Sequence, residues 1–189
     1  MRLFVALALP SSSVSDLERV VAPLRPAWPG LRWTGQEAWH LTLAFLGEVE
    51  DGLESRLGTR LERAAARHAS LLLSLRGAGA FPAPGRARVL WAGIQGDRRG
   101  LAALAASVAA GARRAGAPPS GEGRRYQPHL TLARCRAPAD VRPLVEQLSG
   151  YDGRPWTASE VYLIRSRPGG EPRYQTLGTW RLRASPASH

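Results

Sequence analysis

The sequence predicts an α+β protein made of two similar, pseudo-symmetric β-rich lobes with helices on the outside. Short apolar runs that suit strands alternate with Ala-, Leu- and Arg-rich runs that have helical spacing. The pentapeptide HLTLA occurs twice, beginning at His40 and at His129, once in each half of the chain. No linker separates the halves, so we expect the 189 residues to form one bilobal domain, residues 1–189.

The N-terminal elements follow from apolar runs and helix boundary signals. Residues 2–9 (RLFVALAL) form an apolar run that predicts a buried strand. Residues 13–26 predict a helix, with Ser13 or Ser15 as its N-cap and Pro26 near its end.

The next elements alternate in the same way. Residues 38–49 contain the first pentapeptide and predict a strand that Gly47 closes. Residues 52–69 have apolar and small residues at helical spacing, with Arg and Glu on the remaining face. Residues 70–81 and 86–94 predict paired strands around the turn-rich segment PAPGR.

The second half of the chain shows the same alternation of predicted strands and helices. Its first helix is expected at 100–116, and a polar loop then leads into a strand at 126–135 that holds the second pentapeptide. A short helix is expected at 138–151, where Pro143 is tolerated because it falls in the first turn. The closing strands are expected at 159–166 and 174–183.

The charge of the chain favours an anionic partner. It has 26 basic and 15 acidic residues, a net charge of +11, and no lysine, so every basic residue is arginine. A GC-rich genome is one explanation for arginine in place of lysine, but the excess charge suits RNA. The missing lysine excludes ligases that act through a nucleotidyl-lysine and also excludes a phosphate-binding P-loop.

The cellular location of the protein is inferred from sequence features that the chain lacks. No apolar run approaches the roughly 18 residues of a membrane span, and the N-terminal run lacks a signal-peptide cleavage site. The single Cys135 excludes an intramolecular disulfide and suits a reducing compartment. We therefore expect a cytoplasmic protein without a membrane association.

The repeated pentapeptide predicts a pair of reactive groups. On a strand, the His and Thr of each copy face one way and the two Leu residues face the other. If the lobes face each other, His40 with Thr42 and His129 with Thr131 converge on one groove. Two imidazoles on opposite sides of a phosphorus atom can serve as acid and base, and threonine hydroxyls can donate to phosphate oxygens, without a metal.

Two alternatives remain open from the residues alone. A histidine on a strand is often a structural residue, and five shared letters can arise by chance. A zinc site formed by His40, His129 and Cys135 is the other alternative, although the chain has no CxxC, no HExxH and no acidic cluster.

The motifs resemble those of the 2H phosphoesterase superfamily, and specifically the bacterial and archaeal RNA 2′,3′-cyclic phosphodiesterases, also called 2′-5′ RNA ligases. The segments RLFVALALP, HLTLAFLGEV, RVLWAGI, QPHLTLAR and RYQTLGTWRL occur in the order of that family. The resemblance covers nearly the whole chain. It implies a 2H phosphoesterase-like fold with the active-site groove between the lobes, and no cofactor.

The resemblance also implies roles for single residues. His40 matches the proton donor to the leaving oxygen, and His129 matches the base that activates water. Thr42 and Thr131 match the threonines that hold the phosphate. Arg134 matches a basic residue that follows the second motif, but strict alternation would place it on the core face, so it reaches the groove only if the strand twists, bulges or ends there.

The reaction implied is hydrolysis of RNA 2′,3′-cyclic phosphate ends, tRNA fragments among them, to 2′-phosphomonoesters by a monomer that needs no metal. With an RNA 5′-hydroxyl as the attacking group, related sites join ends through a 2′-5′ bond without ATP. One alternative is a phosphodiesterase for small cyclic nucleotides or 2′-5′ oligonucleotides. Another is a non-catalytic RNA-binding module whose histidines only line a groove.

Four further residues are candidates for RNA contact. Phe45 follows the first motif and suits either base stacking or the core. Tyr126 precedes the second motif beside Arg124 and Arg125. Arg173 and Tyr174 match an Arg-Tyr pair of the family at the rim of the groove.

Overall fold

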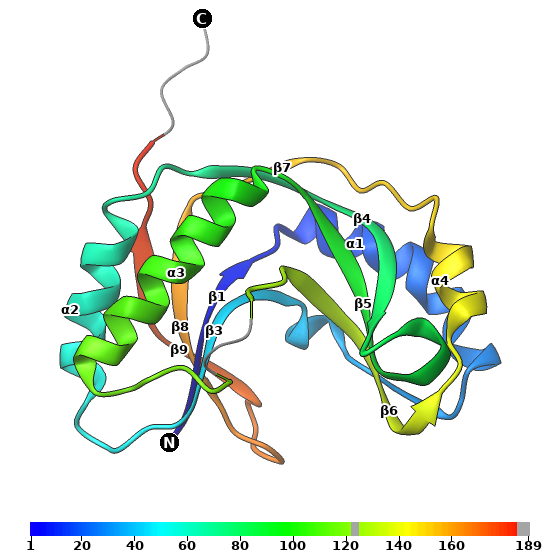
Figure 1. Ribbon diagram of the computed structural model, residues 1–189, viewed down its shortest axis with the longest axis horizontal. Coiled ribbons are helices and arrows are strands. Elements are labelled where there is room, and N and C mark those ends of the chain that lie inside the picture. The colour runs from blue at the N-terminus through cyan, green and yellow to red at the C-terminus, as the bar shows by residue number, and fades with distance from the viewer. Residues whose placement is uncertain (122–124, 185–189) are drawn as a thin grey trace, which may run out of the picture.

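The computed structural model describes residues 1–121 and 125–184, which form an arch of two antiparallel sheets (Figure 1). Arg124 lies outside these ranges. The first sheet has the strand order β3-β1-β8-β9 and the second has the order β2-β6-β5-β4-β7. The predicted α+β class with two β-rich lobes is confirmed.

The bounds of the elements are as follows. The first sheet contains β1 (Arg2–Ala8), β3 (His40–Glu48), β8 (Glu160–Ser166) and β9 (Tyr174–Arg181). The second sheet contains β2 (Leu31–Trp33), β4 (Leu71–Phe81), β5 (Ala87–Gly96), β6 (His129–Ala139) and β7 (Trp156–Ala158). The α-helices are α1 (Ser11–Val21), α2 (Glu54–Ala65), α3 (Arg98–Ala115) and α4 (Arg142–Leu148), and the 3-10 helices are η1 (Ala22–Ala27), η2 (Gln36–Ala38) and η3 (Pro84–Arg86).

The two lobes are interleaved in the sequence. The first sheet combines strands from both ends of the chain, whereas the second takes its strands from the middle. Neither lobe is therefore built from one half of the chain alone. The reason lies in β1, which has five consecutive buried residues and therefore needs a neighbour on each side; β3 and β8 supply them.

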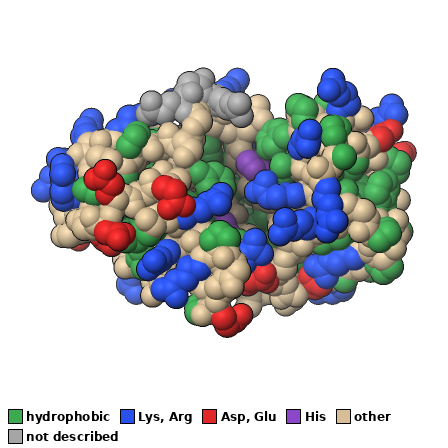
Figure 2. All heavy atoms as spheres, turned by 90° about the horizontal axis from the view of Figure 1, so that it is seen from below, with side chains coloured by type: hydrophobic (Ala, Val, Ile, Leu, Met, Phe, Trp, Pro, Cys, Tyr) green, Lys and Arg blue, Asp and Glu red, His purple; other side chains and the backbone are tan. Residues whose placement is uncertain are grey.

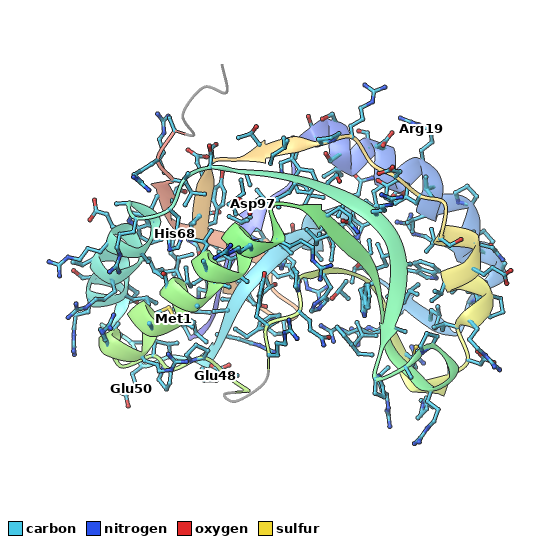
Figure 3. The ribbon with its side chains drawn as sticks, turned by 45° about the horizontal axis from the view of Figure 1, so that its top comes forward. Met1, Arg19, Glu48, Glu50, His68 and Asp97 are labelled. Atoms are coloured by element: carbon cyan, nitrogen blue, oxygen red, sulfur yellow. The ribbon has the colours of Figure 1, made fainter. Side chains whose placement is uncertain are left out.

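Helices cover the sheets of the arch, as expected, but α3 also borders the groove between the lobes. Helices α2 and α3 pack together over the first sheet, and α4 packs against β4 of the second (Figure 1). Asp97, labelled in Figure 3, caps α3 by accepting a hydrogen bond from the Gly100 N–H (2.8 Å). The helix ends at Gly116, whose φ of 92° lies in the left-handed region that favours glycine.

Several expected boundaries differ from the observed ones. Helix α1 begins at Ser11 with Pro10 as its N-cap, so neither Ser13 nor Ser15 caps it, because the first free N–H groups bond to the Pro10 carbonyl. Strand β6 begins at His129 rather than at 126, and the preceding Pro128 has no N–H for a ladder bond. The prediction for Pro143 is confirmed, because it lies at the start of α4.

The three-residue strands β2 and β7 were absent from the expected elements, because so few residues carry no periodic signal. Within the described ranges, no helix combines the length and apolar character that crossing a membrane requires.

Candidate active site

The two pentapeptides occupy equivalent strands at the junction of the two sheets. The first lies in β3, which pairs with β1, and the second lies in β6, which pairs with β5. In both strands the two leucines are buried, and the histidine and threonine lie half-buried on the opposite face. In both strands, therefore, the leucines face the core, and the histidine and threonine face the opposite side.

A β-bulge follows the second motif and reverses the alternation. The register of β6 with β5 shifts so that Leu132 has no partner opposite it. Beyond this extra residue, Ala133 is buried and Arg134 is exposed, on the same face as Thr131. Strict alternation is therefore the wrong description here, and the bulge meets the condition under which Arg134 reaches the groove.

The first motif carries the same bulge. The register of β3 with β1 shifts so that Leu43 has no partner, which leaves Ala44 buried and Phe45 exposed on the face of Thr42. Phe45 is 46% exposed, so the core interpretation of this residue is wrong. Phe45 and Arg134 occupy corresponding positions in the two lobes.

Thr34 supports the bulge in β6 and connects it to the first motif. Its N–H donates to the Leu132 carbonyl (2.9 Å), and its hydroxyl lies 2.9 Å from the carbonyl oxygens of both Thr131 and Leu132. The same hydroxyl accepts a hydrogen bond from the indole N–H of the buried Trp39 (3.0 Å), the residue before His40. No motif in the sequence indicated this link between the two histidine strands.

His40 lies in an aromatic environment. Its ring stacks on Phe4, with the ring centres 4.5 Å apart, and meets Tyr174 edge-on at 5.4 Å. Burial among these rings lowers the pKa of His40 to about 4, because the charged form loses its hydration. Tyr174 is therefore placed against a candidate catalytic side chain, and the Arg173 guanidinium lies 5.5 Å from the centre of the Tyr174 ring.

His129 is held by a hydrogen bond instead. Its Nδ1 lies 2.7 Å from the Gln127 carbonyl oxygen, so Nδ1 carries the proton of the neutral ring and donates it. This leaves Nε2 as an acceptor. Phe81 meets the ring edge-on at 4.9 Å. Burial lowers the pKa of His129, the carbonyl bond opposes this shift, and the charge of Arg134 adds to it.

A groove of about 970 Å³ runs between the lobes. Thr42 and Phe45 line it from the first lobe, His129 and Phe81 line it from the second, and small side chains of α3 form a further wall. Figure 2 shows histidine side chains in the hollow of this face, with arginines gathered beside it. The groove thus brings residues of both motifs together.

Tyr126 also lines the groove, but its hydroxyl donates to the Thr42 carbonyl (3.1 Å). Burial raises the pKa of Tyr126 because it disfavours the phenolate. The hydroxyl thus fixes the segment before β6 to β3, and only the ring faces the groove.

The residues around the groove do not form a recognisable metal site. Within residues 1–121 and 125–184, no group of three or more His, Cys, Asp or Glu side chains is arranged to hold a metal ion. Cys135 is buried opposite Leu31 on the core face of β6, away from the face of His129. The three proposed zinc ligands therefore do not converge.

An α+β arch with two equivalent HxT strands, and a groove lined by Thr42 of one motif and His129 of the other, has the features of a phosphoesterase of the two-histidine class. The family model of the 2′-5′ RNA ligase superfamily matches residues 10–170, and the chain belongs to this superfamily.

Curated relatives of the chain are enzymes with one shared name. A protein of Thermus thermophilus named RNA 2′,3′-cyclic phosphodiesterase is 35% identical over 97% of this chain and 91% of its own length. Proteins of the same name from Aeropyrum pernix and Escherichia coli are 37% and 32% identical, over 75% and 96% of this chain and 80% and 96% of their own lengths.

Solved structures agree with this placement. A crystal structure of a Thermus thermophilus protein matches with a TM-score of 0.75 and 31% identity, over 97% of this chain and 99% of that one. Escherichia coli LigT in its apo form matches with a TM-score of 0.73 and 29% identity, over 96% and 97% of the two chains.

Proposed function

We propose that this protein hydrolyses RNA 2′,3′-cyclic phosphate ends to 2′-phosphomonoesters without a metal, by acid–base catalysis with His40 and His129. The observation that carries the proposal is the pair of equivalent bulged strands, each with its histidine and threonine on one face, beside a groove that Thr42 of the first pair and His129 of the second line. The shared name of the curated relatives supports the substrate.

His129 is the proposed base. Because its Nδ1–H donates to the Gln127 carbonyl, the lone pair of Nε2 is free to accept a proton from water. The water oxygen forms a bond to phosphorus, and the bond from phosphorus to the 3′ oxygen breaks. His40 gives its proton to that oxygen, which leaves as a 3′-hydroxyl.

His40 must be protonated to act as the acid, although its aromatic surroundings favour the neutral ring. A phosphate anion in the groove would raise the pKa of His40, because an opposite charge stabilises the imidazolium strongly where water is scarce. Substrate binding and protonation of His40 are thus coupled.

The remaining residues stabilise charge on the phosphate. The hydroxyls of Thr42 and Thr131 are the proposed donors to its non-bridging oxygens, and Arg134 supplies positive charge from the same strand face. Each of these groups gains importance as negative charge grows in the transition state.

The same arrangement would support ligation. An RNA 5′-hydroxyl that replaces water gives a 2′-5′ phosphodiester and the same 3′-hydroxyl, and opening of the cyclic phosphate takes the place of ATP. We further infer a monomer in the cytoplasm that acts on RNA ends, those of tRNA fragments included.

The test is product analysis with an RNA that ends in a 2′,3′-cyclic phosphate, incubated with the protein in EDTA. Mass spectrometry should show the gain of one water, and the product should resist an enzyme specific for 3′-phosphates. Tight binding without any product would instead support the non-catalytic RNA-binding module.

A further inference from the structure

Two arginines lie directly opposite each other on the second sheet. In the antiparallel register of β2 with β6, Arg32 faces Arg134. Directly opposed residues share a face of the sheet, with Cβ atoms about 4.5–5.5 Å apart. Both side chains are exposed. The two arginine side chains therefore lie on the face of the sheet that also carries His129 and Thr131.

Like charges in this position destabilise a sheet unless a counter-ion is present. Ion pairs between described arginines and carboxylates form at Arg19, Arg25, Arg142 and Arg181. Neither Arg32 nor Arg134 is among them. Their repulsion is thus not offset by any carboxylate of the described ranges, and a bound anion would offset it.

The pair also lies at a suitable place along β6. Thr131, Arg134 and the catalytic candidate His129 share one strand face. The three residue-to-residue steps from Thr131 to Arg134 span at most about 10 Å at ~3.3 Å per step. Arg134 is thus within reach of the reacting phosphate, and Arg32, on the next strand outward, is within reach of the neighbouring nucleotide.

Only the second lobe has this feature. Strand β2 lies outside β6, whereas β3, the equivalent strand of the first sheet, has no strand beyond it in the described part of the chain. There the Phe45 carbonyl accepts a hydrogen bond from the Ser120 N–H (2.7 Å), and Tyr126 bonds to the Thr42 carbonyl. The extra strand brings a second arginine to one side of the groove alone.

We propose that Arg32 and Arg134 form a second anion site, which binds the phosphodiester that precedes the cyclic phosphate, and that Arg32 thereby favours RNA chain ends over cyclic mononucleotides. The inference rests on the proposed function and names its substrate class. A guanidinium binds phosphate oxygens through two parallel N–H groups. Arg134 lies between the reacting phosphate and Arg32, so Arg32 is the residue that serves the second phosphate alone.

The experiment compares kcat/KM for a dinucleotide that ends in a 2′,3′-cyclic phosphate with kcat/KM for the cyclic mononucleotide. Arg32→Ala should lower the ratio of the two values about tenfold, and Arg32→Lys should restore part of it. The salt dependence of kcat/KM for the dinucleotide should fall by about 0.7 in log–log slope, as expected for one lost phosphate contact.

Arg19→Ala is the matched control. Arg19 pairs with Asp16 on α1, on the outside of the arch (Figure 3), so the ratio should not change. An unchanged ratio for Arg32→Ala would overturn the second anion site and leave the proposed function intact. A marked drop in the melting temperature of Arg32→Ala would also overturn the site, because removing a like-charge pair should leave that temperature equal or higher.

If the wild type hydrolysed neither substrate, the proposed function would fail, and binding would then test the site by itself. The probe is a dinucleotide with a 3′-phosphate, titrated against wild type and Arg32→Ala. Weaker binding by the variant, with a reduced salt slope, would support the anion site; equal binding would overturn it.

Discussion

The two lobes carry the same five residues and the same bulge, but they present different side chains one step later. Beyond the bulge, the first lobe exposes Phe45 and the second exposes Arg134. Aromatic rings contact both histidines, but His129 of the second lobe also donates a hydrogen bond to the Gln127 carbonyl, whereas His40 is held by the rings of Phe4 and Tyr174. The residues that the two lobes share suit the phosphate group, whose oxygens are arranged nearly symmetrically. The residues that differ between the lobes suit the rest of the nucleotide, which has a base on one side and a chain of phosphodiesters on the other.

Next to the groove, therefore, the first lobe adds an aromatic side chain beyond its motif, and the second lobe adds a cationic one. An aromatic face accepts a base, and a guanidinium pair accepts a phosphodiester. A cyclic phosphate placed between the two threonines would thus be oriented by groups outside the repeat. Substitutions of the histidines and threonines that both motifs share should therefore lower activity the most. Substitutions of residues that differ between the lobes, such as Phe45, should lower it less.

Loss of either imidazole should have the largest effect. His40→Ala and His129→Ala should each lower kcat by at least about 10²–10⁴-fold, because each removes a proton-transfer group. The measurement is the rate of cyclic-phosphate opening in EDTA. His68→Gln is the control: His68, labelled in Figure 3, bonds to Ser107 (2.7 Å) and is not among the residues that line the groove, so the variant should keep wild-type activity. Near-native turnover by either alanine variant would refute the paired-histidine mechanism.

Removal of the aromatic side chain should come next. Phe45→Ala should weaken substrate binding by about 5- to 150-fold, which corresponds to the roughly 1–3 kcal/mol of one base–aromatic contact. The loss should appear in KM for nucleotide substrates, with kcat largely unchanged. Phe45→Tyr keeps the ring and should keep KM. An equal loss in kcat alone would contradict a stacking role.

The link between the two motif strands should matter less than the groove itself. Thr34→Val leaves the Trp39 indole N–H and the bulge carbonyls without their hydroxyl partner, which should cost about 1–3 kcal/mol of unfolding free energy. The misplaced strand should lower kcat several-fold. Thr34→Ser restores the hydroxyl and should recover both values. Chemical denaturation and steady-state kinetics measure the two effects.

The pH dependence of stability should reveal the buried His40. Its folded pKa of about 4 lies below the unfolded value of 6.5, so the neutral ring stabilises the fold. This contribution is complete above pH 6.5 and is lost as the pH falls through 4, by about 3 kcal/mol at most. His40→Gln should flatten the decline of the unfolding free energy between pH 6.5 and 4. An unchanged slope would mean that His40 is hydrated.

Features with a local sequence signal were predictable. Alternation in the pentapeptide indicated the faces of His40, Thr42, His129 and Thr131, and the helical spacing indicated α2 and α3. The two bulges were not predictable, because an extra residue changes the face of Arg134 and Phe45 without leaving any mark in composition.

Strand pairings between residues far apart in the sequence were not predictable either. Nothing near β1 in the sequence indicates that β8 is its second neighbour, and the three residues of β2 look like loop. Thr34 therefore carried no signal, since its role depends on the strand that it meets 97 residues later. Tyr174 was a candidate by resemblance, and only its packing on the His40 ring gives that candidacy a physical basis.

The interleaved topology has a consequence for synthesis. His40 is made early, but Tyr174, which packs against it, and strands β8 and β9, which complete its sheet, are made after all the other strands of the two sheets. A nascent chain that has not yet extruded β8 and β9 therefore holds a half-built groove, and it should gain the ability to process RNA only after these two strands emerge from the ribosome.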